Sequence, residues 1–243
     1  MLRMVILLIL LLFGCAPNWH MYDDFVYVPI NTGEFDIATW QKITDTESEI
    51  HIYIEGDGHA FNGRGIPTNN PTPHSAFMRK LAASDEWPNV VYMARPCQFI
   101  MSRACTVTDW TTGRFSKKII DSMSDAVRKI AGQNPIVLIG YSGGAMISGL
   151  MIQNNNDLNM QKWITIAGVL NHADWTQYFG DAKLEQSMNL YQLPEISQLH
   201  YIAENDAVVP YSLSYKWTNG QNMIVVPNAS HGDFGKLQLN FEH

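Results

Sequence analysis

One stretch constrains the fold more than any other, Asn134-Pro-Ile-Val-Leu-Ile-Gly-Tyr-Ser-Gly-Gly-Ala-Met146. Ile136–Ile139 is a short apolar run opened by a proline, which is typical of a strand buried on both faces. Residues 140–144 then read G-x-S-x-G, and residues 145–151 can continue as a helix. Strand, tight turn and helix in this order favour a serine, Ser142, held on a strained turn at the carboxyl end of a sheet. The alternative is a glycine-rich turn without chemistry.

Composition sets the broad class. The chain has 243 residues, of which 46% are hydrophobic and 16% charged, so it can bury a large core and is not intrinsically disordered. The formal net charge is −7, and no basic stripe is present, which argues against nucleic acid as a partner. The length fits one domain, and we expect it to span residues 15–243.

The first fourteen or so residues have the pattern of a signal peptide. Arg3 precedes an apolar run over Met4–Phe13, which is too short to cross a bilayer as a helix. The run ends in Leu12-Phe-Gly-Cys15, which resembles a bacterial lipoprotein lipobox. That resemblance implies cleavage after residue 14, lipidation of Cys15 and anchoring to the outer membrane, facing the periplasm, in a Gram-negative source. A plain secretory signal or an uncleaved anchor is the alternative.

The cysteine count is consistent with export. Of three cysteines, Cys97 and Cys105 remain as a pair if Cys15 is lipidated, and an even count in an exported chain favours a disulfide. Two free thiols, or a pair of metal ligands, are the other possibilities.

The remaining pattern alternates strands with helical stretches. Two opening strands, Phe25–Ile30 and Phe35–Ile43, flank a hairpin signal at Asn31-Thr-Gly33. Further strands are expected over Glu49–Ile54, Asn89–Ala94, Trp163–Ala167, Gln198–Ala203 and Asn222–Val226, and helices over His74–Ser84 and Arg114–Ala131, with Gly132 as C-cap. This alternation predicts an α/β fold with a mostly parallel sheet covered on both faces.

Two loops supply partners for Ser142. Asp206 follows the Gln198–Ala203 strand directly, and His231 follows the Asn222–Val226 strand. The order Ser, Asp, His after successive strands predicts that His231 acts as general base and that Asp206 orients it. Taken singly, His231 reads as a surface histidine and Asp206 as a turn cap. Other candidate acids are Glu204, Asp174, Asp181 and Asp233, whereas His51 and His200 lie inside strands and are expected to be packed or half-exposed.

An oxyanion would need backbone N–H donors. Gly143 follows the serine, and the glycine-rich loop after the Glu49–Ile54 strand offers Asp57 first and Gly58 second. A phosphate or dinucleotide loop is the rival interpretation, but the segment lacks the required G-K-[ST] or final glycine. A metal site at Asp57 and His59 has no further support in the sequence.

Together these segments resemble the α/β-hydrolase fold over essentially the whole mature sequence. More narrowly, the chain is similar to exported bacterial α/β hydrolases through Ala94-Arg-Pro-Cys-Gln98 with Cys105, Trp110 before Arg114-Phe-Ser116, and Asn171-His-Ala-Asp-Trp175. The resemblance implies a central sheet of about eight strands, and hydrolysis of an ester, thioester or amide through an acyl-enzyme, without cofactor or metal. Asn171–Ser197 is too short for a large lid, and its Trp175, Tyr178, Phe179 and Leu184 either line a pocket or pack over the sheet.

The sequence therefore predicts a membrane-anchored serine hydrolase, carboxylesterase- or thioesterase-like, that acts on a small ester or acyl substrate. A non-catalytic lipoprotein that binds through the same fold, or a peptidase on the same scaffold, is the alternative, because fold does not fix substrate.

Overall fold

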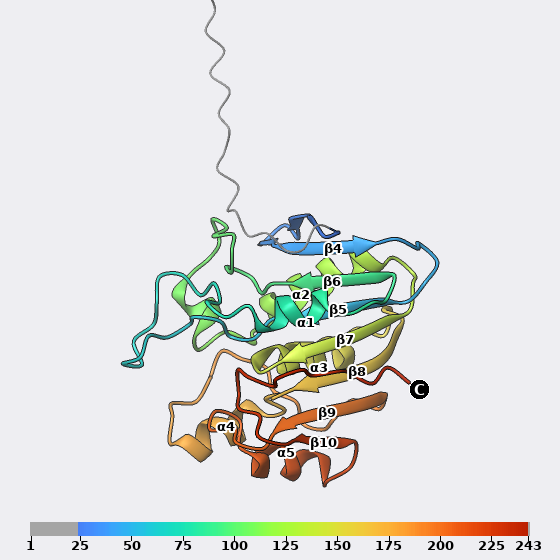
Figure 1. The fold of residues 1–243 in the computed structure, drawn as a ribbon. Coiled ribbons are helices and arrows are strands. Elements are labelled where there is room, and N and C mark those ends of the chain that lie inside the picture. Colours follow the sequence, from blue (N-terminus) through green and yellow to red (C-terminus); the bar gives the residue numbers. More distant parts are fainter. Residues whose placement is uncertain (1–23, 243) are drawn as a thin grey trace, which may run out of the picture.

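An eight-stranded sheet runs through the centre of the computed structural model, which describes residues 24–242 (Figure 1). The predicted signal peptide over residues 1–14 and the predicted lipidation site Cys15 lie outside the described residues. The strand order within the described part is β1-β4-β6-β5-β7-β8-β9-β10. The six strands from β6 to β10 in this order run parallel to one another, whereas β4 pairs in antiparallel fashion with both β1 and β6. The expected mostly parallel α/β sheet of about eight strands is confirmed.

The strands of the described part are β1 Val26–Tyr27, β2 Ile30–Asn31, β3 Asp36–Ile37, β4 Thr39–Ile43, β5 Ile50–Ile54, β6 Asn89–Met93, β7 Ile136–Tyr141, β8 Met160–Ile166, β9 Ser197–Ala203 and β10 Met223–Val226. The helices are α1 Phe77–Ala83, the 3-10 helix η1 Val107–Trp110, α2 Lys117–Ala131, α3 Gly143–Asn154, α4 His172–Phe179 and α5 Tyr211–Thr218.

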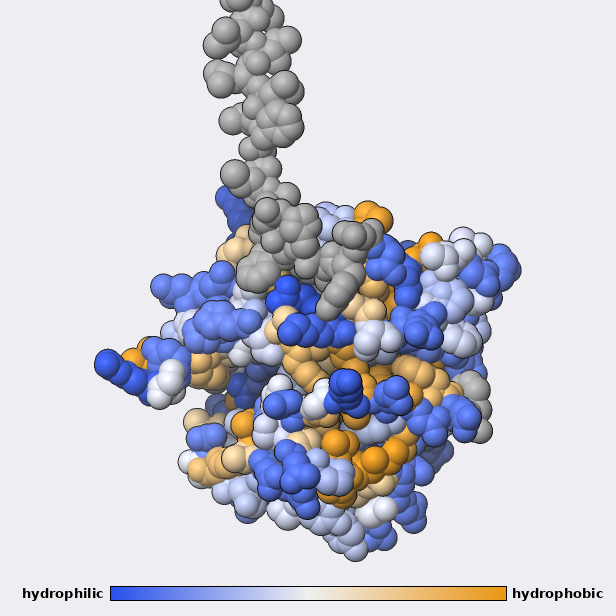
Figure 2. All heavy atoms as spheres, in the orientation of Figure 1, coloured by the Kyte–Doolittle hydropathy of each residue, from blue (hydrophilic) through white to orange (hydrophobic). Residues whose placement is uncertain are grey.

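Two layers cover the sheet. Apolar side chains of α2 and α3 pack with one face of the strands, while α1 and the C-terminal tail around Phe234 pack with the other. Because side chains alternate along a strand, β5 supplies Ile52 to the first layer and Tyr53 to the second. On the face turned to the viewer, apolar side chains remain visible between polar ones (Figure 2).

The opening hairpin is shorter than predicted. The two expected strands are interrupted, so that β2 and β3 form a separate two-stranded sheet while β1 and β4 join the main one. Pro29 lies between β1 and β2, and a proline has no N–H to continue a ladder.

The long helix also begins later than predicted. It starts at Lys117 rather than at Arg114, because the backbone of Ser116 is extended, with φ −65° and ψ 159°. It ends at Ala131, and Gly132 follows with φ 57°, as expected of its position beyond the helix. Arg114 and Phe115 are thereby left in the loop before α2.

The predicted disulfide between Cys97 and Cys105 is present. It closes the start of the loop after β6, a short loop whose cross-link stabilises the fold by on the order of 2–3 kcal/mol in the loop-entropy model. Arg95 and Gln98, on either side of Cys97, both contact the loop after β5. The disulfide therefore braces a segment that holds part of the candidate site.

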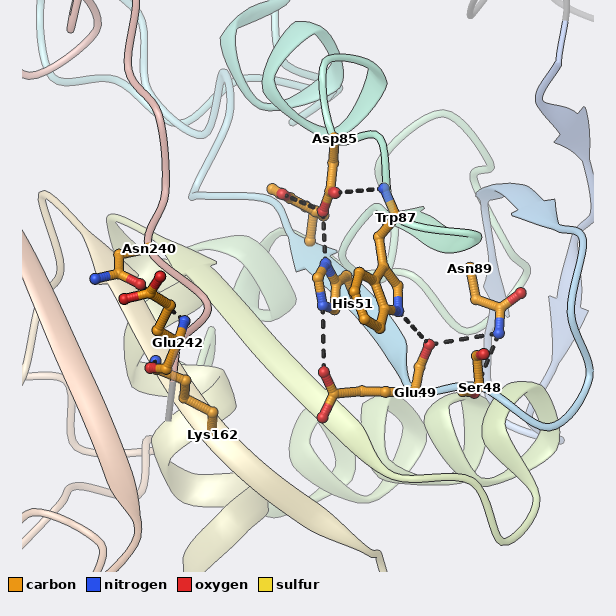
Figure 3. Close-up of polar contacts among 10 residues, drawn as sticks. Ser48, Glu49, His51, Asp85, Trp87, Asn89, Lys162, Asn240 and Glu242 are labelled. Atoms are coloured by element: carbon orange, nitrogen blue, oxygen red, sulfur yellow. Dashed lines mark hydrogen bonds and ion pairs between the residues drawn. The ribbon is translucent and has the colours of Figure 1, made fainter.

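A network of polar contacts surrounds His51 near the amino-terminal end of β5 (Figure 3). His51 Nδ1 lies 2.6 Å from Asp85 Oδ2 and its Nε2 lies 3.4 Å from Glu49 Oε1. The ring stacks between Trp87 and Phe241 of the C-terminal tail, with centroids 5.1 and 4.1 Å away. His51 lies near the start of β5, so this network fastens the tail far from the carboxyl ends of the strands.

His200 in β9 should make stability depend on pH. It is 1% exposed, its Nδ1 lies 2.8 Å from Thr165 Oγ1, and its Nε2 lies 3.0 Å from Gln198 Oε1. Burial lowers the pKa of His200 from 6.5 to about 4. The folded state therefore keeps the ring neutral where the unfolded chain already protonates it. The resulting stabilisation is complete above pH 6.5 and is lost as the pH falls toward 4.

We expect the free energy of unfolding of the wild type to fall, relative to that of His200→Gln, by on the order of 3 kcal/mol between pH 7 and pH 4. Urea denaturation of both proteins across this range measures the difference. A difference in the free energy of unfolding between the two proteins that does not change with pH would show that His200 does not titrate in this way.

Candidate active site

Ser142 occupies a sharp turn between β7 and α3. Its φ of 52° and ψ of −120° are rare for a non-glycine residue and cost about 1–3 kcal/mol. Three backbone hydrogen bonds hold it there: its N–H donates to Ile166 O at 3.0 Å, and its carbonyl accepts from Ala145 and Val169 at 3.1 and 3.0 Å. The strained position is therefore held by β8, by the loop that follows it and by the first turn of α3.

Glycine is required on both sides of this turn by space. A Cβ on Gly140 would lie 2.6 Å from Gly144 O and from Ala145 Cα, both backbone atoms of the next helix. A Cβ on Gly143 would overlap Asp57 Oδ1 and lie 2.9 Å from Arg95 Nη1. The loop after β5 thus presses directly against the residue that follows Ser142.

The structure brings Ser142, His231 and Asp206 together. His231 Nε2 lies 3.0 Å from Ser142 Oγ, and His231 Nδ1 lies 2.9 Å from Asp206 Oδ2. The loops that carry Asp206 and His231 leave β9 and β10, whose carboxyl ends point to the same side as that of β7 (Figure 1). The distances alone describe a hydrogen-bonded series from an alcohol through an imidazole to a carboxylate.

Asp206 is fixed by its second oxygen. Its Oδ1 accepts hydrogen bonds from the N–H groups of Val208 and Val209, at 2.8 and 2.7 Å, and its side chain is fully shielded from solvent. Since both oxygens only accept, Nδ1 of His231 carries the proton and Nε2 directs a lone pair at Ser142. The Tyr141 hydroxyl donates to His231 O at 2.9 Å and holds the second loop.

The rival acids have other partners. Glu204 accepts from the N–H of Asn228 at 2.8 Å, Asp174 accepts from Lys216 and Trp217, and Asp233 belongs to the turn with Ser230 and Gly235. Asp181 is exposed beyond the end of α4. None of these carboxylates bonds His231 in the described part of the chain.

The loop that carries the predicted oxyanion donors Asp57 and Gly58 lies against the Ser142 turn, since a Cβ on Gly56 would come within 3.2 Å of Ser142 Cβ. Within residues 24–242 no hydrogen bond is donated by the backbone N–H of Asp57, Gly58 or Gly143. Gln98 Nε2 donates to Gly56 O at 2.9 Å and so fixes the loop that carries the first two. The assignment of the N–H groups of Gly143 and of Asp57 or Gly58 as oxyanion donors stays a prediction.

Two arginines at the site were not assigned a role from the sequence. Asp57 is ion-paired with Arg95 through Oδ1 and with Arg114, whose Nε lies 3.2 Å from Oδ2. Burial by itself raises the pKa of Asp57, but the charges of Arg114 and Arg95 outweigh it and hold the pKa below its usual value. The sequence offered no signal for these contacts beyond the fact that both arginines stand in segments on which the resemblance to exported hydrolases was based.

A cavity of about 390 Å³ opens in front of Ser142 and His231. Its apolar wall is formed by Phe61, Phe115, Val169, Trp175 and Val208. Two larger hollows, of about 560 and 830 Å³, contain none of Ser142, Asp206 and His231. The cavity at Ser142 is therefore the candidate substrate-binding site, although it is smaller than the other two.

The four apolar residues singled out in the segment after β8, Trp175, Tyr178, Phe179 and Leu184, differ in their positions. Trp175 lines the cavity and donates from Nε1 to Val208 O at 2.7 Å. Tyr178 and Phe179 are exposed on α4 away from the cavity lining, and Leu184 is packed in the core. The pocket-lining interpretation thus holds for Trp175 alone of these four.

Among residues 24–242, no group of three or more His, Cys, Asp or Glu side chains is arranged to hold a metal ion. In the same residues, none of the helices combines the length and the apolar character needed to span a bilayer.

Comparison with solved structures identifies the fold. The chain is similar to an α/β serine hydrolase without a lid from Xanthomonas campestris, with a TM-score of 0.55, 16% identity and 87% of each chain covered. It is also similar to an esterase from Pyrococcus furiosus, with a TM-score of 0.56, 13% identity, and 85% of this chain and 84% of that chain covered. A third is an α/β serine hydrolase homologue from Coxiella burnetii, with a TM-score of 0.52, 17% identity, and 88% and 91% covered.

No protein-family model matches the sequence, and no curated protein matches it. At such identities the similarity establishes the fold and not the reaction. Strand order, the Ser142 turn and these structures agree, and the chain has the α/β-hydrolase fold.

Proposed function

We propose that the protein is a serine hydrolase that cleaves a carboxylic ester or thioester through an acyl-enzyme on Ser142. The observation that carries this proposal is the hydrogen-bonded series Ser142 Oγ, His231, Asp206, with both distances at or below 3.0 Å, of which Ser142 and His231 line a cavity. An alcohol becomes a nucleophile when a base in this position accepts its proton.

In the proposed reaction, Ser142 Oγ attacks the acyl carbon while His231 Nε2 takes the hydroxyl proton. Asp206 keeps the imidazole in the required tautomer and stabilises the imidazolium that forms. The negative charge on the former carbonyl oxygen is received by the N–H of Gly143 and of Asp57 or Gly58. His231 then donates its proton to the leaving alcohol or thiol, and water repeats the sequence to release the acid.

A panel of small substrates on the folded chain tests the reaction class. We expect 4-nitrophenyl esters and acyl thioesters to be hydrolysed, with loss of the activity in Ser142→Ala, and aminoacyl 4-nitroanilides to be cleaved far more slowly. Preferential cleavage of the anilides would favour a peptidase. Absence of turnover on every substrate by the folded wild type would favour the non-catalytic binding protein.

We also propose that the chain is exported and anchored to a bacterial envelope membrane through a lipid on Cys15. The support is the apolar run ending in Leu12-Phe-Gly-Cys15. Expression of the full chain in a Gram-negative host, with fractionation and mass spectrometry, tests this. Acylation and membrane association should be lost in Cys15→Ser, and equal fractionation of the two proteins would contradict the proposal.

A further inference from the structure

Arg114 lines the cavity at Ser142 with hydrogen-bond donors that its ion pair with Asp57 does not use. It lies in the loop before α2 and lines the cavity, yet only 5% of its surface is exposed. Its guanidinium carbon sits 5.5 Å from the centroid of Phe115 and 5.6 Å from that of Trp175. Nε is buried near Asp57 without the geometry of a hydrogen bond, whereas the two Nη groups keep accessible surface and make no hydrogen bond within residues 24–242. Buried guanidinium groups normally use their donors.

Asp57 does not balance this charge. Its carboxylate is shared with Arg95, which bonds Oδ1 and also donates from Nη2 to Arg114 O at 2.7 Å. Two guanidinium groups therefore face one carboxylate. The next acid, Glu55, accepts from the Tyr92 hydroxyl and the Gly56 N–H, and burial raises its pKa, which disfavours its charged form. Asp206 is committed to His231, so this wall of the cavity keeps positive charge.

His172 adds a neutral polar group beside the arginine. It is 6% exposed, lines the same cavity, and stacks on Phe115 with centroids 5.8 Å apart. Neither ring nitrogen makes a hydrogen bond of good geometry in the described part of the chain, although backbone groups of Ser187 and Met188 lie near the ring. Burial, together with the nearby charge of Arg114, lowers the pKa of His172, so the ring is uncharged at neutral pH and can donate one hydrogen bond.

We propose that the natural substrate carries a carboxylate close to its scissile acyl bond, and that Arg114, assisted by His172, binds it. The free edge of a guanidinium offers parallel N–H groups that match the two oxygens of a carboxylate. Arg114 Nε lies 3.2 Å from Asp57 Oδ2, and Asp57 Oδ1 occupies the space that a Cβ on Gly143, next to Ser142, would need. A substrate carboxylate bound by Arg114 would therefore lie only a few atoms from the acyl carbon. This inference rests on the proposed hydrolase activity and names its substrate class.

Two matched substrate pairs test the proposal. For a carboxylate on the acyl side, mono-4-nitrophenyl succinate is compared with 4-nitrophenyl butyrate; for the alcohol side, 4-acetoxybenzoate is compared with its methyl ester. We expect Arg114→Gln to lower kcat/KM for the anionic member of at least one pair by about tenfold or more beyond its effect on the neutral member. The ratio between wild type and variant cancels differences in intrinsic reactivity.

Arg114→Lys, which keeps the charge but loses the fork, should fall between wild type and Arg114→Gln. Arg128→Gln is the matched control, because Arg128 pairs with Asp157 on the outer surface of α2, and it should leave both ratios unchanged. Equal losses on the anionic and neutral members of both pairs would mean that Arg114 serves only to position Asp57, which would overturn the proposal.

Binding provides a readout that does not need turnover. Monomethyl succinate should bind to Ser142→Ala in a calorimetric titration at least about tenfold more tightly than methyl butyrate, and Arg114→Gln in that background should abolish the preference. Equal affinity for the two esters would contradict the carboxylate site. If neutral esters are hydrolysed but Arg114 gives no preference for the anionic substrates, the carboxylate site alone is refuted. If monomethyl succinate binds but no ester is hydrolysed, the proposed hydrolase activity is refuted.

Discussion

Asp206→Asn is expected to lower kcat by about 10⁴-fold while the protein stays folded. The asparagine Oδ1 can keep the hydrogen bonds from the N–H groups of Val208 and Val209. Its amide nitrogen then faces His231 Nδ1 as a donor, which forces the ring proton onto Nε2. In that tautomer Nε2 has no lone pair for the Ser142 hydroxyl, so the base is lost although every group remains in place.

Steady-state kinetics on the best ester of the panel, with thermal melting as a check on folding, measures this effect. Glu204→Gln is the matched control, since Glu204 was the nearest rival acid in the sequence and bonds Asn228 instead. It should retain activity within a few fold. A loss in Glu204→Gln as large as that in Asp206→Asn would show that the acid has been assigned wrongly.

Gly143→Ala is expected to reduce kcat/KM by about 10²–10³-fold, as removal of one oxyanion donor does. The added methyl group would overlap Asp57 Oδ1, and that carboxylate cannot retreat easily because Arg95 and Arg114 hold it. The start of α3 must therefore move, and the N–H of residue 143 moves with it. Overpacking of this kind also costs about 1–3 kcal/mol of stability.

Kinetics and urea denaturation of Gly143→Ala separate the two effects. Gly63→Ala is the matched control, because a Cβ on Gly63 meets no heavy atom within 4 Å, and it should change neither activity nor stability measurably. Activity of Gly143→Ala within a few fold of the wild type would contradict the close contact between Asp57 and the turn.

Much of the arrangement that carries Ser142, Asp206 and His231 could be predicted from the sequence, because the sequence patterns that indicate it are local. A buried strand, a G-x-S-x-G turn and polar residues placed directly after strands can all be recognised within ten residues or so. The parallel sheet then brings the carboxyl ends of β7, β9 and β10 together, and with them Ser142, Asp206 and His231. The periodicity of α2 likewise predicted its end, although not its beginning.

The contacts around Asp57 could not be predicted in the same way. Asp57, Arg95 and Arg114 lie on three separate loops, and no spacing rule connects an acid after β5 with an arginine before α2. The interruption of the opening hairpin also depends on tertiary pairing, since β1 pairs with β4 rather than continuing into β2. Arg114 was included in the helix because its neighbours have helical periodicity, whereas its contacts keep it in the preceding loop.

The proposed hydrolase activity depends on Ser142 being a nucleophile that His231 activates. Incubation of the folded wild type with a fluorophosphonate, followed by peptide mass spectrometry, tests this most directly. We predict a single covalent adduct on Ser142 that forms rapidly in the wild type, very slowly in His231→Ala and not at all in Ser142→Ala. An unlabelled wild type, or a label on another residue that persists in Ser142→Ala, would contradict the account.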